Sequence, residues 1–185
     1  GNVIIPSTGG TLSTATAGTS NFRAGVNAGN SIASGGNYNT VVGDEAGTAI
    51  TTGDNNTAVG YASLSANTTG VNMTAVGYNA GLSHTTGNSS TFIGTDSGKL
   101  TTTGVGNTFV GDGSGRQNTT GASNVAIGQS ALLANTTASN NTAVGLNALT
   151  ANTTGGDNVA IGKDALDANT TGSGNTAVGS SAGTG

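Results

Sequence analysis

Residues 141–157 read NTAVGLNALTANTTGGD, and residues 158–174 repeat the pattern as NVAIGKDALDANTTGSG. The glycine of NTAVG recurs every seventeen residues: Gly43, Gly60, Gly77, Gly94, Gly111, Gly128, Gly145, Gly162 and Gly179. A looser copy ending at Gly25 precedes them with one extra residue. A strict internal period of this kind is the sequence signature of a repeat architecture, in which each copy is one structural unit stacked on the next.

The copies can be compared when each is numbered from the Asn of NTAVG, so that Asn141 is position one. Position four is always Val or Ile, position five is always Gly, position eight is Ala or Ser, and positions thirteen and fourteen are Thr in every complete copy. Positions six, seven, ten and sixteen vary freely, as solvent-facing or turn positions do. The repeat therefore separates positions that the structure constrains from positions that face solvent.

Glycine, Asn and β-branched residues at this density oppose helix formation, and seventeen residues are too few for a helical hairpin. The segments NTAV, xAL and NTT are separated by Gly- or Asn-rich corners and predict about three short strands per copy. We expect an all-β fold, a parallel β-solenoid of about ten 17-residue coils stacked ~4.8 Å apart. Residues 39–185 form the regular repeats, residues 21–38 a degenerate first coil, and residues 1–20 an N-terminal cap or docking strand.

Stacking of the coils would place equivalent side chains in columns. The glycine at position five is expected to adopt the same backbone conformation, with positive φ, in every coil. The asparagines at positions one and twelve are expected to form side-chain amide ladders. The ladder at position one contains Asn107, Asn124, Asn141, Asn158 and Asn175, and the ladder at position twelve contains Asn67, Asn118, Asn135, Asn152 and Asn169.

Two apolar columns flank each NTAVG strand. Adjacent strand residues point to opposite faces, so Ala143 at position three and Val144 at position four cannot enter the same interior. Position nine is Gly in the copies whose position three is Val or Phe, and position three is Ala in the copies whose position nine is Leu, which indicates that these two positions share one packed space. The Val and Ile column then needs a second dry environment. We therefore expect self-association, most simply as a homotrimer about a common axis or as a helical filament.

The two ends of the sequence also favour assembly. The last copy stops at SAGTG without a polar capping segment, and an uncapped solenoid end is an open strand edge that pairs with another chain. Near the start, Val3, Ile4 and Ile5 form a β-branched run closed by Pro6, the sole proline. This run is expected either to cap the first coil or to dock on the open end of a neighbouring subunit.

The composition argues against several function classes. The chain is 33% hydrophobic and 6% charged, with a net charge of −4, and its four scattered Lys and Arg residues cannot neutralise many phosphates, so no nucleic-acid binding is expected. No apolar run approaches the length of a membrane span, and the absence of Cys excludes disulfides and thiolate metal sites. The acidic residues do not recur at one position, and the single His, His84, is interpreted as a surface residue in the position-twelve column. We expect no membrane insertion, enzyme activity, cofactor or metal.

Three features carry ligand hypotheses. Tyr61 and Tyr78, at position six of adjacent copies, are candidates to stack on sugar rings. The paired Thr columns make ice binding a minor alternative, although adjacent Thr residues turn only one column outward. Asn-x-Thr sequons at position twelve are possible glycosylation sites: Asn67, Asn118, Asn135, Asn152 and Asn169.

The motif NTAVG, followed by AL, ANTTG and another NTAVG, resembles repeats of bacteriophage tail-fibre proteins and of large bacterial surface fibres. The NVAIG form at residues 124–128 and 158–162 is also distantly similar to head repeats of trimeric autotransporter adhesins, whose period is shorter. The resemblance covers residues 39–185 well and 21–38 loosely. It implies a structural, non-enzymatic fibre or filament subunit located outside the cell, on the cell surface or on a virion. An adhesin or tail-fibre shaft that binds cell-surface glycans is the alternative.

Overall fold

The computed structural model describes residues 17–184 and contains ten parallel β-strands of three residues each. Each strand is the centre of one NTAVG motif, where β-branched residues favour extended backbone. The strands are β1 (Phe22–Ala24), β2 (Thr40–Val42), β3 (Thr57–Val59), β4 (Thr74–Val76), β5 (Thr91–Ile93), β6 (Thr108–Val110), β7 (Val125–Ile127), β8 (Thr142–Val144), β9 (Val159–Ile161) and β10 (Thr176–Val178).

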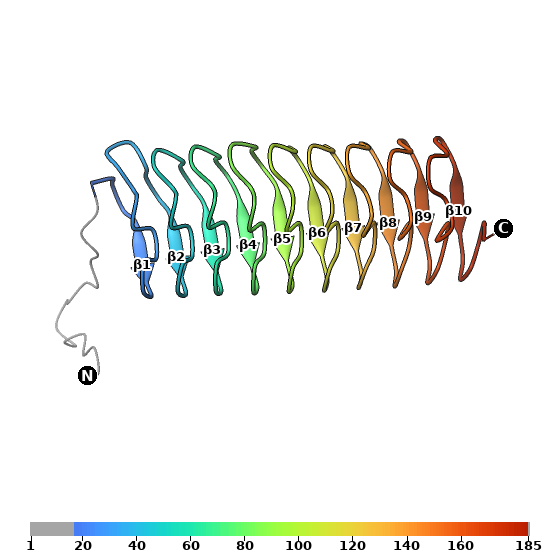
Figure 1. The fold of residues 1–185 in the computed structure, drawn as a ribbon, viewed down its shortest axis with the longest axis horizontal. Helices are drawn as coiled ribbons and strands as arrows, with labels where there is room; N and C mark the ends of the chain where they lie inside the picture. Colours follow the sequence, from blue (N-terminus) through green and yellow to red (C-terminus); the bar gives the residue numbers. More distant parts are fainter. Residues whose placement is uncertain (1–16, 185) are drawn as a thin grey trace.

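The strands form one sheet in sequence order, and the chain winds once around the rod between consecutive strands (Figure 1). From β2 onward each residue pairs with its equivalent seventeen residues later, as Thr142 does with Val159, so the columns stay in register. Phe22 instead pairs with Thr40, because the first coil is one residue longer. The all-β parallel β-solenoid expected from the repeat is therefore confirmed.

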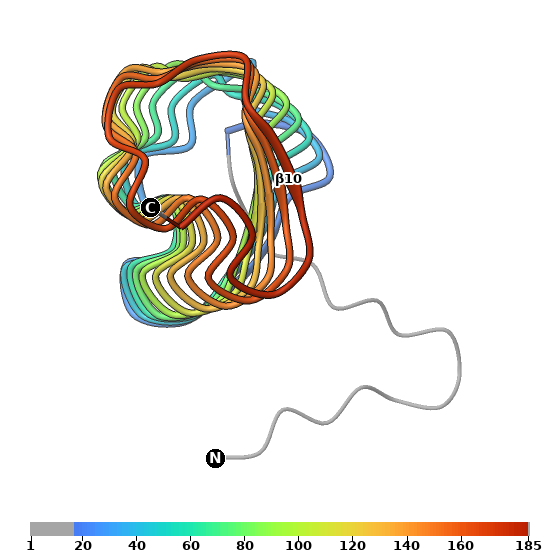
Figure 2. The same cartoon turned by 90° about the vertical axis from the view of Figure 1, so that its right-hand side faces the viewer.

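Only one of the three expected sides of each coil is a regular strand. Ala62 and Leu64, at positions seven and nine, have φ of 53° and 48°, so the AL segment is a series of turns and not a strand. The turn segments still hydrogen-bond from coil to coil, because the amide of Leu64 donates to the carbonyl of Ala80 (3.0 Å) and that of Thr68 to Thr85 (2.8 Å). Viewed along the axis, successive coils superimpose with a small progressive rotation (Figure 2).

The rod has a single hydrophobic interior. The side chains at positions three and nine fill it, and Ala143 and Leu149 are both fully buried, as the repeat predicts. Val144 points out of the coil and is partly exposed, because neighbouring strand residues face opposite sides of the sheet. Within residues 17–184 the Val and Ile column has no second dry space around it.

A large side chain at position three is matched by a small one at position nine, and the reverse, as the repeat predicts. Phe109 fills its coil so completely that a Cβ atom added to Gly115 would lie 2.5 Å from the Phe109 ring, and Gly98 stands in the same relation to Phe92. The two rings stack with their centroids 5.6 Å apart. Where position three is Ala, Leu fills the space in spite of its left-handed φ, 54° at Leu132. A large residue at one of the two positions therefore goes with a small one at the other. In coil four Ala75 and Gly81 are both small, and Phe92 and Leu64 of the adjacent coils fill the space beside Gly81.

The glycine at position five has a positive φ in every coil, 132° at Gly111, as the repeat predicts. A Cβ atom at Gly111 would also lie 2.6 Å from the carbonyl carbon of Gly128 in the next coil. Both the backbone conformation and the stacking distance therefore require glycine at this corner.

Buried asparagines at position one form the expected ladder. The Asn141 Oδ1 accepts a hydrogen bond from the backbone amide of Asn158 at 3.1 Å and another from its Nδ2 at 3.1 Å, while the same Nδ2 donates to the carbonyl of Gly172. The ladder is interrupted in the middle of the rod by Met73 and Ser90, where the Ser90 amide has only the Met73 sulfur as acceptor at 3.4 Å. Sulfur is a weak acceptor, so the position-one ladder is weaker at this junction than where Asn residues follow one another.

Candidate functional surfaces

The outer sheet face, which we define as the side chains at positions two and four of β2 to β10, is a regular array of β-branched residues. Position two is Thr or Val and is only partly buried in all but the last coil, while position four is Val or Ile. The exposed fractions are 36% at Val76, 39% at Ile93 and 41% at both Ile127 and Ile161. Isolated exposed apolar residues are ordinary, but here part-exposed and exposed Val and Ile side chains form a continuous column along the rod.

Tyr61 and Tyr78 lie stacked on another side of the rod, at position six after the glycine corner. Their ring centroids are 5.5 Å apart, the rings are inclined by 15°, and each residue is 52% exposed. The structure thus brings together the two tyrosines that the repeat selects, and their outer ring edges face solvent. No hydrogen bond from either hydroxyl to a described residue is recorded.

A charged cluster follows the tyrosines in the next two coils. The Asp96 carboxylate lies 3.1 Å from Lys99 Nζ and 3.5 Å from Arg116 Nε, and it accepts a hydrogen bond from Asn79 Nδ2 at 3.1 Å. Burial acts to raise the pKa of Asp96, but the hydrogen bonds from Asn79 and Lys99 and the two positive charges outweigh it and hold the pKa below its ordinary 3.8. Sequence reasoning missed this cluster, although the adjacent cations at position ten were its visible signal.

Four of the five position-twelve asparagines, Asn118 to Asn169, form the expected ladder, and it lies inside the rod. Asn67 stands apart from it, because His84 and not Asn follows in the next coil. Asn67, Asn118, Asn135 and Asn152 have no exposed surface, and Asn135 Nδ2 donates to Asn118 Oδ1 at 2.7 Å and to the Ala138 carbonyl at 3.1 Å. Asn169 is part-buried and donates in the same pattern to Asn152 and Gly172. The Nδ2 atom that would carry a glycan is therefore enclosed, so glycosylation at these positions does not fit the folded coil.

Other sequons do face solvent. Asn55, Asn72 and Asn140 at position seventeen and Asn88 at position sixteen are exposed corner residues. Asn140 Nδ2 donates to Asp157 of the next coil at 3.0 Å, so this corner has its own polar column. A modifying enzyme would find its acceptors at these corners.

His84 is buried, and its interpretation as a surface residue is wrong. It has no exposed surface, and its ring packs against Phe92 at 5.9 Å between centroids. Neither ring nitrogen makes a hydrogen bond of good geometry to a described residue, although the backbone of Gly104 lies near enough to oppose burial by raising the pKa of His84. The Oδ1 atom of Asn67 in the preceding coil is likewise unpartnered. Burial lowers the pKa of His84 from 6.5 to about 4. A column position filled by Asn in most coils thus carries a neutral imidazole at His84.

The two Thr columns divide as their adjacency predicts. At position thirteen the hydroxyl is used between coils, since Thr68 Oγ1 donates to the Thr85 carbonyl at 3.2 Å and Thr85 Oγ1 to Thr102 at 3.1 Å. At position fourteen Thr69 and Thr86 are exposed. The surface therefore presents a single column of threonines on this side.

Several sequence expectations concern features that residues 17–184 either do not show or do not include. In this part of the chain no group of three or more His, Asp or Glu residues is placed to hold a metal ion, and no helix is long and apolar enough to cross a membrane. Val3, Ile4 and Ile5, the run expected to cap the first coil or dock on a neighbour, lie outside the described residues.

Comparison of the chain with family models, with curated proteins and with solved structures gave no match. Its function therefore has to be argued from its own surfaces.

Proposed function

We propose that this protein is a structural, non-enzymatic fibre or filament subunit that self-associates through the outer sheet face. The observation that carries the proposal is the column of Val and Ile side chains in strict register, all partly or fully exposed, from Val42 in β2 to Val178 in β10. A monomer in water gains nothing from such a column, whereas burial of each side chain between copies would contribute about 1 kcal/mol at the observed exposures. Association through position four supplies the second dry environment.

The geometry of the face favours a second copy of the same chain as its partner. Both faces would repeat with the same coil spacing, so β-branched columns of one rod fit between columns of the other over the whole length. Three rods packed about a common axis, or rods added laterally in a helical filament, both satisfy this requirement. The location that goes with this role is extracellular, on a cell surface or on a virion, which agrees with the repeat resemblance.

The oligomeric state tests this proposal. Replacement of Ile127 and Ile161 by Lys is expected to weaken association at least about 100-fold, because two apolar contacts are lost and the introduced charges would face their equivalents in other copies. Sedimentation velocity of wild type and variant would show an oligomer and a monomer, respectively. The matched control changes Thr120 and Thr154, exposed at position fourteen, to Lys and keeps the same net charge as the test variant. A monomeric wild type at high concentration would contradict the proposal.

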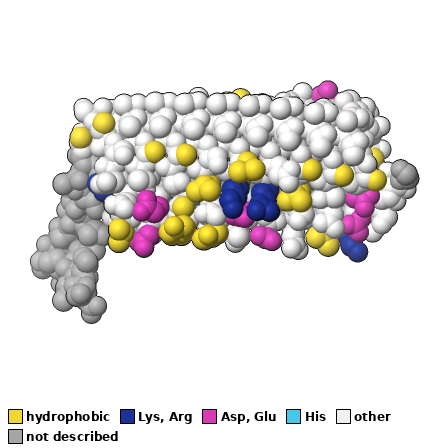
Figure 3. Space-filling view, in the orientation of Figure 1, with side chains coloured by type: hydrophobic (Ala, Val, Ile, Leu, Met, Phe, Trp, Pro, Cys, Tyr) yellow, Lys and Arg dark blue, Asp and Glu magenta, His cyan; other side chains and the backbone are white. Residues whose placement is uncertain are grey.

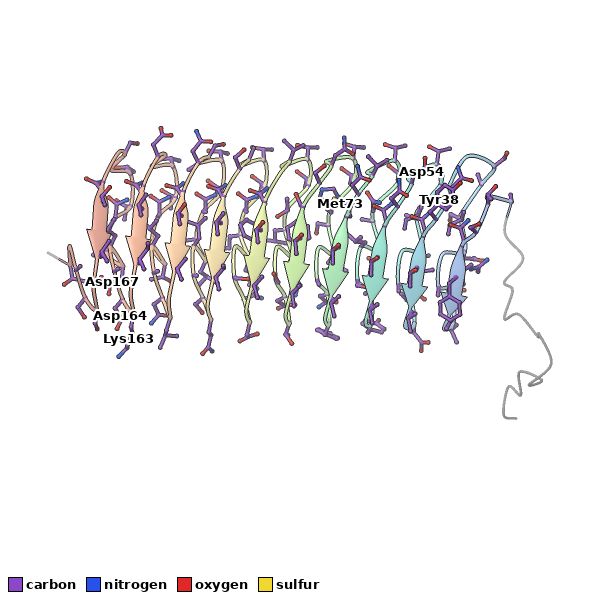
Figure 4. The ribbon with its side chains drawn as sticks, turned by 180° about the vertical axis from the view of Figure 1, so that it is seen from behind. Tyr38, Asp54, Met73, Lys163, Asp164 and Asp167 are labelled. Atoms are coloured by element: carbon purple, nitrogen blue, oxygen red, sulfur yellow. The ribbon has the colours of Figure 1, made fainter. Side chains whose placement is uncertain are left out.

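Saccharide recognition by the stacked tyrosines is a second candidate function. Tyr61 and Tyr78 offer adjacent, half-exposed rings, and sugar rings pack their C–H faces against aromatic rings of this kind. Tyr61→Ala is expected to weaken binding to a neutral oligosaccharide about ten-fold on a glycan array followed by calorimetry. Tyr38→Ala, which removes an exposed tyrosine on a different corner (Figure 4), is the control. If the wild type binds no neutral glycan, saccharide recognition by the tyrosines is ruled out and only the scaffold function remains.

A further inference from the structure

We propose that the side of the rod formed by coils four to seven (residues 73–140) carries a binding site for an anionic saccharide, centred on Lys99, Arg116 and Leu100. The inference rests on the second candidate function, saccharide recognition along this side, and adds to it the charge of the ligand and the residues that select it. It does not involve the outer sheet face, so a rod assembled through that face keeps this side free.

The first observation is the arrangement of the cations. Lys99 and Arg116 occupy position ten of successive coils, and both are held by one carboxylate, that of Asp96. Asp96 also accepts from Asn79, so its two oxygens are occupied by three partners. Arg116 uses Nε for this contact and its side chain is 47% exposed, which leaves the terminal nitrogens of the guanidinium for a ligand. A guanidinium presented in this way binds carboxylate or sulfate oxygens through paired hydrogen bonds.

The second observation is a groove of about 400 Å³ beside these cations. This volume lies within the ordinary range of small-molecule sites, roughly 300–1,000 Å³. Its lining joins an apolar wall to polar groups: Lys99, Leu100, Arg116, Gln117, Thr119 and Thr136. Leu100, at position eleven, is 43% exposed where most other coils have Ala. An apolar wall with charged and amide donors at its edge suits a pyranose ring that bears an anionic substituent.

The third observation is that the groove continues the tyrosine column. The Asp96 amide donates to the Tyr78 carbonyl at 2.9 Å, and Asn79, the neighbour of Tyr78, donates its side chain to Asp96. Figure 3 shows a pair of basic groups near the middle of the lower half of the rod, with acidic and hydrophobic side chains beside them. An oligosaccharide lying along the rod would contact the tyrosine rings and then the groove.

The other charge on this side fixes the position of the anionic group. Asp112, at position six of coil six, is exposed and forms no ion pair with a described residue, so it repels an anion placed over the position-six column. The carboxylate or sulfate of the ligand must therefore lie toward position ten, over Arg116. The Asp96 carboxylate does not offset this preference, because its charge is balanced by Lys99 and Arg116.

The test is calorimetric titration of the full chain with four probes: trigalacturonic acid, 3′-sialyllactose, a sulfated chondroitin disaccharide and the neutral maltotriose. We expect at least one anionic saccharide to bind more tightly than maltotriose, with an affinity that falls as salt is raised. The Lys99→Gln, Arg116→Gln double variant is expected to weaken that binding about ten-fold or more and to leave maltotriose unaffected. The carboxylate and sulfate probes distinguish the two sources of negative charge.

Two further variants protect the interpretation. Leu100→Ser removes the apolar wall without altering charge and is expected to weaken binding of the same anionic saccharide. Lys163 is an exposed cation beside Asp164 near the far end of the rod (Figure 4), and Lys163→Gln is expected to leave that binding unchanged. No binding of any anionic saccharide, loss of binding in Lys163→Gln alone, or equal binding of a triglutamate peptide would overturn the proposal. Retained maltotriose binding in those cases would leave the tyrosine function intact.

Discussion

Gly115→Leu is expected to destabilise the middle of the rod by about 3 kcal/mol or more, because the new side chain must occupy space already filled by Phe109. The backbone itself does not forbid leucine at position nine. Gly115 has a φ of 55°, and Leu132 holds nearly the same value, 54°, one coil later. The cost therefore comes from overpacking, and chemical denaturation followed by circular dichroism would measure it.

Phe109→Ala has the opposite defect and is expected to cost about 3–5 kcal/mol, because it leaves a cavity in the rod and removes the stacking partner of Phe92. Combining the two changes recreates the pairing of Ala126 with Leu132 in the next coil. The double variant should lie within about 1–2 kcal/mol of wild type, the residual reflecting the lost ring stack. If the two costs simply added, positions three and nine would not share a packed space.

Acidification from pH 7 to pH 4 is expected to remove about 3 kcal/mol of stability through His84 alone. The pKa of His84 is about 4 in the folded protein and near 6.5 when exposed, so between these values the unfolded chain binds a proton that the folded chain does not. The stabilisation is complete above pH 6.5 and is lost as pH falls through the folded value. Asn67, Phe92 and Thr101, which surround His84 along the rod, do not titrate in this window, and Asp96 titrates below it.

His84→Asn should abolish this pH dependence and raise stability at pH 7 by about 1–3 kcal/mol. In coils seven to nine the asparagine at position twelve donates to the coil before it, as Asn152 does to Asn135 at 3.3 Å, and such a bond would satisfy the orphaned Asn67 Oδ1. Denaturant unfolding of both proteins at pH 7, 5.5 and 4 provides the measurement. His84→Leu is the control, since it removes the titration but leaves Asn67 unpartnered. A wild type as stable at pH 4 as at pH 7 would rule out this account.

The repeat predicted the coil, the strand within it and the packed pair at positions three and nine, because each follows from periodicity and side-chain volume. It did not show which asparagine column lies inside. Asn67 and Asn55 have the same local sequon chemistry, and only the closure of the coil turns the first inward and the second outward. The groove at Leu100 and Arg116 was likewise hidden, since it arises from residues that depart from the repeat.

The extra strands expected along AL and NTT failed for a related reason. A strand would bury only one of the neighbours Ala148 and Leu149, but both are buried. Leu149 adopts a left-handed φ of 52°, which folds the turn inward. Backbone conformations of this kind are rare for leucine and leave no local signal in the sequence. The copies show only that Gly replaces Leu at position nine, and Gly is the residue that adopts a positive φ most readily.

The junction between coils four and five has a mechanical consequence. Column one there offers only the Met73 sulfur to the Ser90 amide, and column twelve offers no bond from His84, so both internal ladders fail at the same level. Backbone hydrogen bonds still cross this junction, as from the Gly81 amide to the Ser97 carbonyl at 2.9 Å. A load along the rod axis is therefore carried across this level by the backbone bonds of the coil wall and not by the side-chain ladders of its interior.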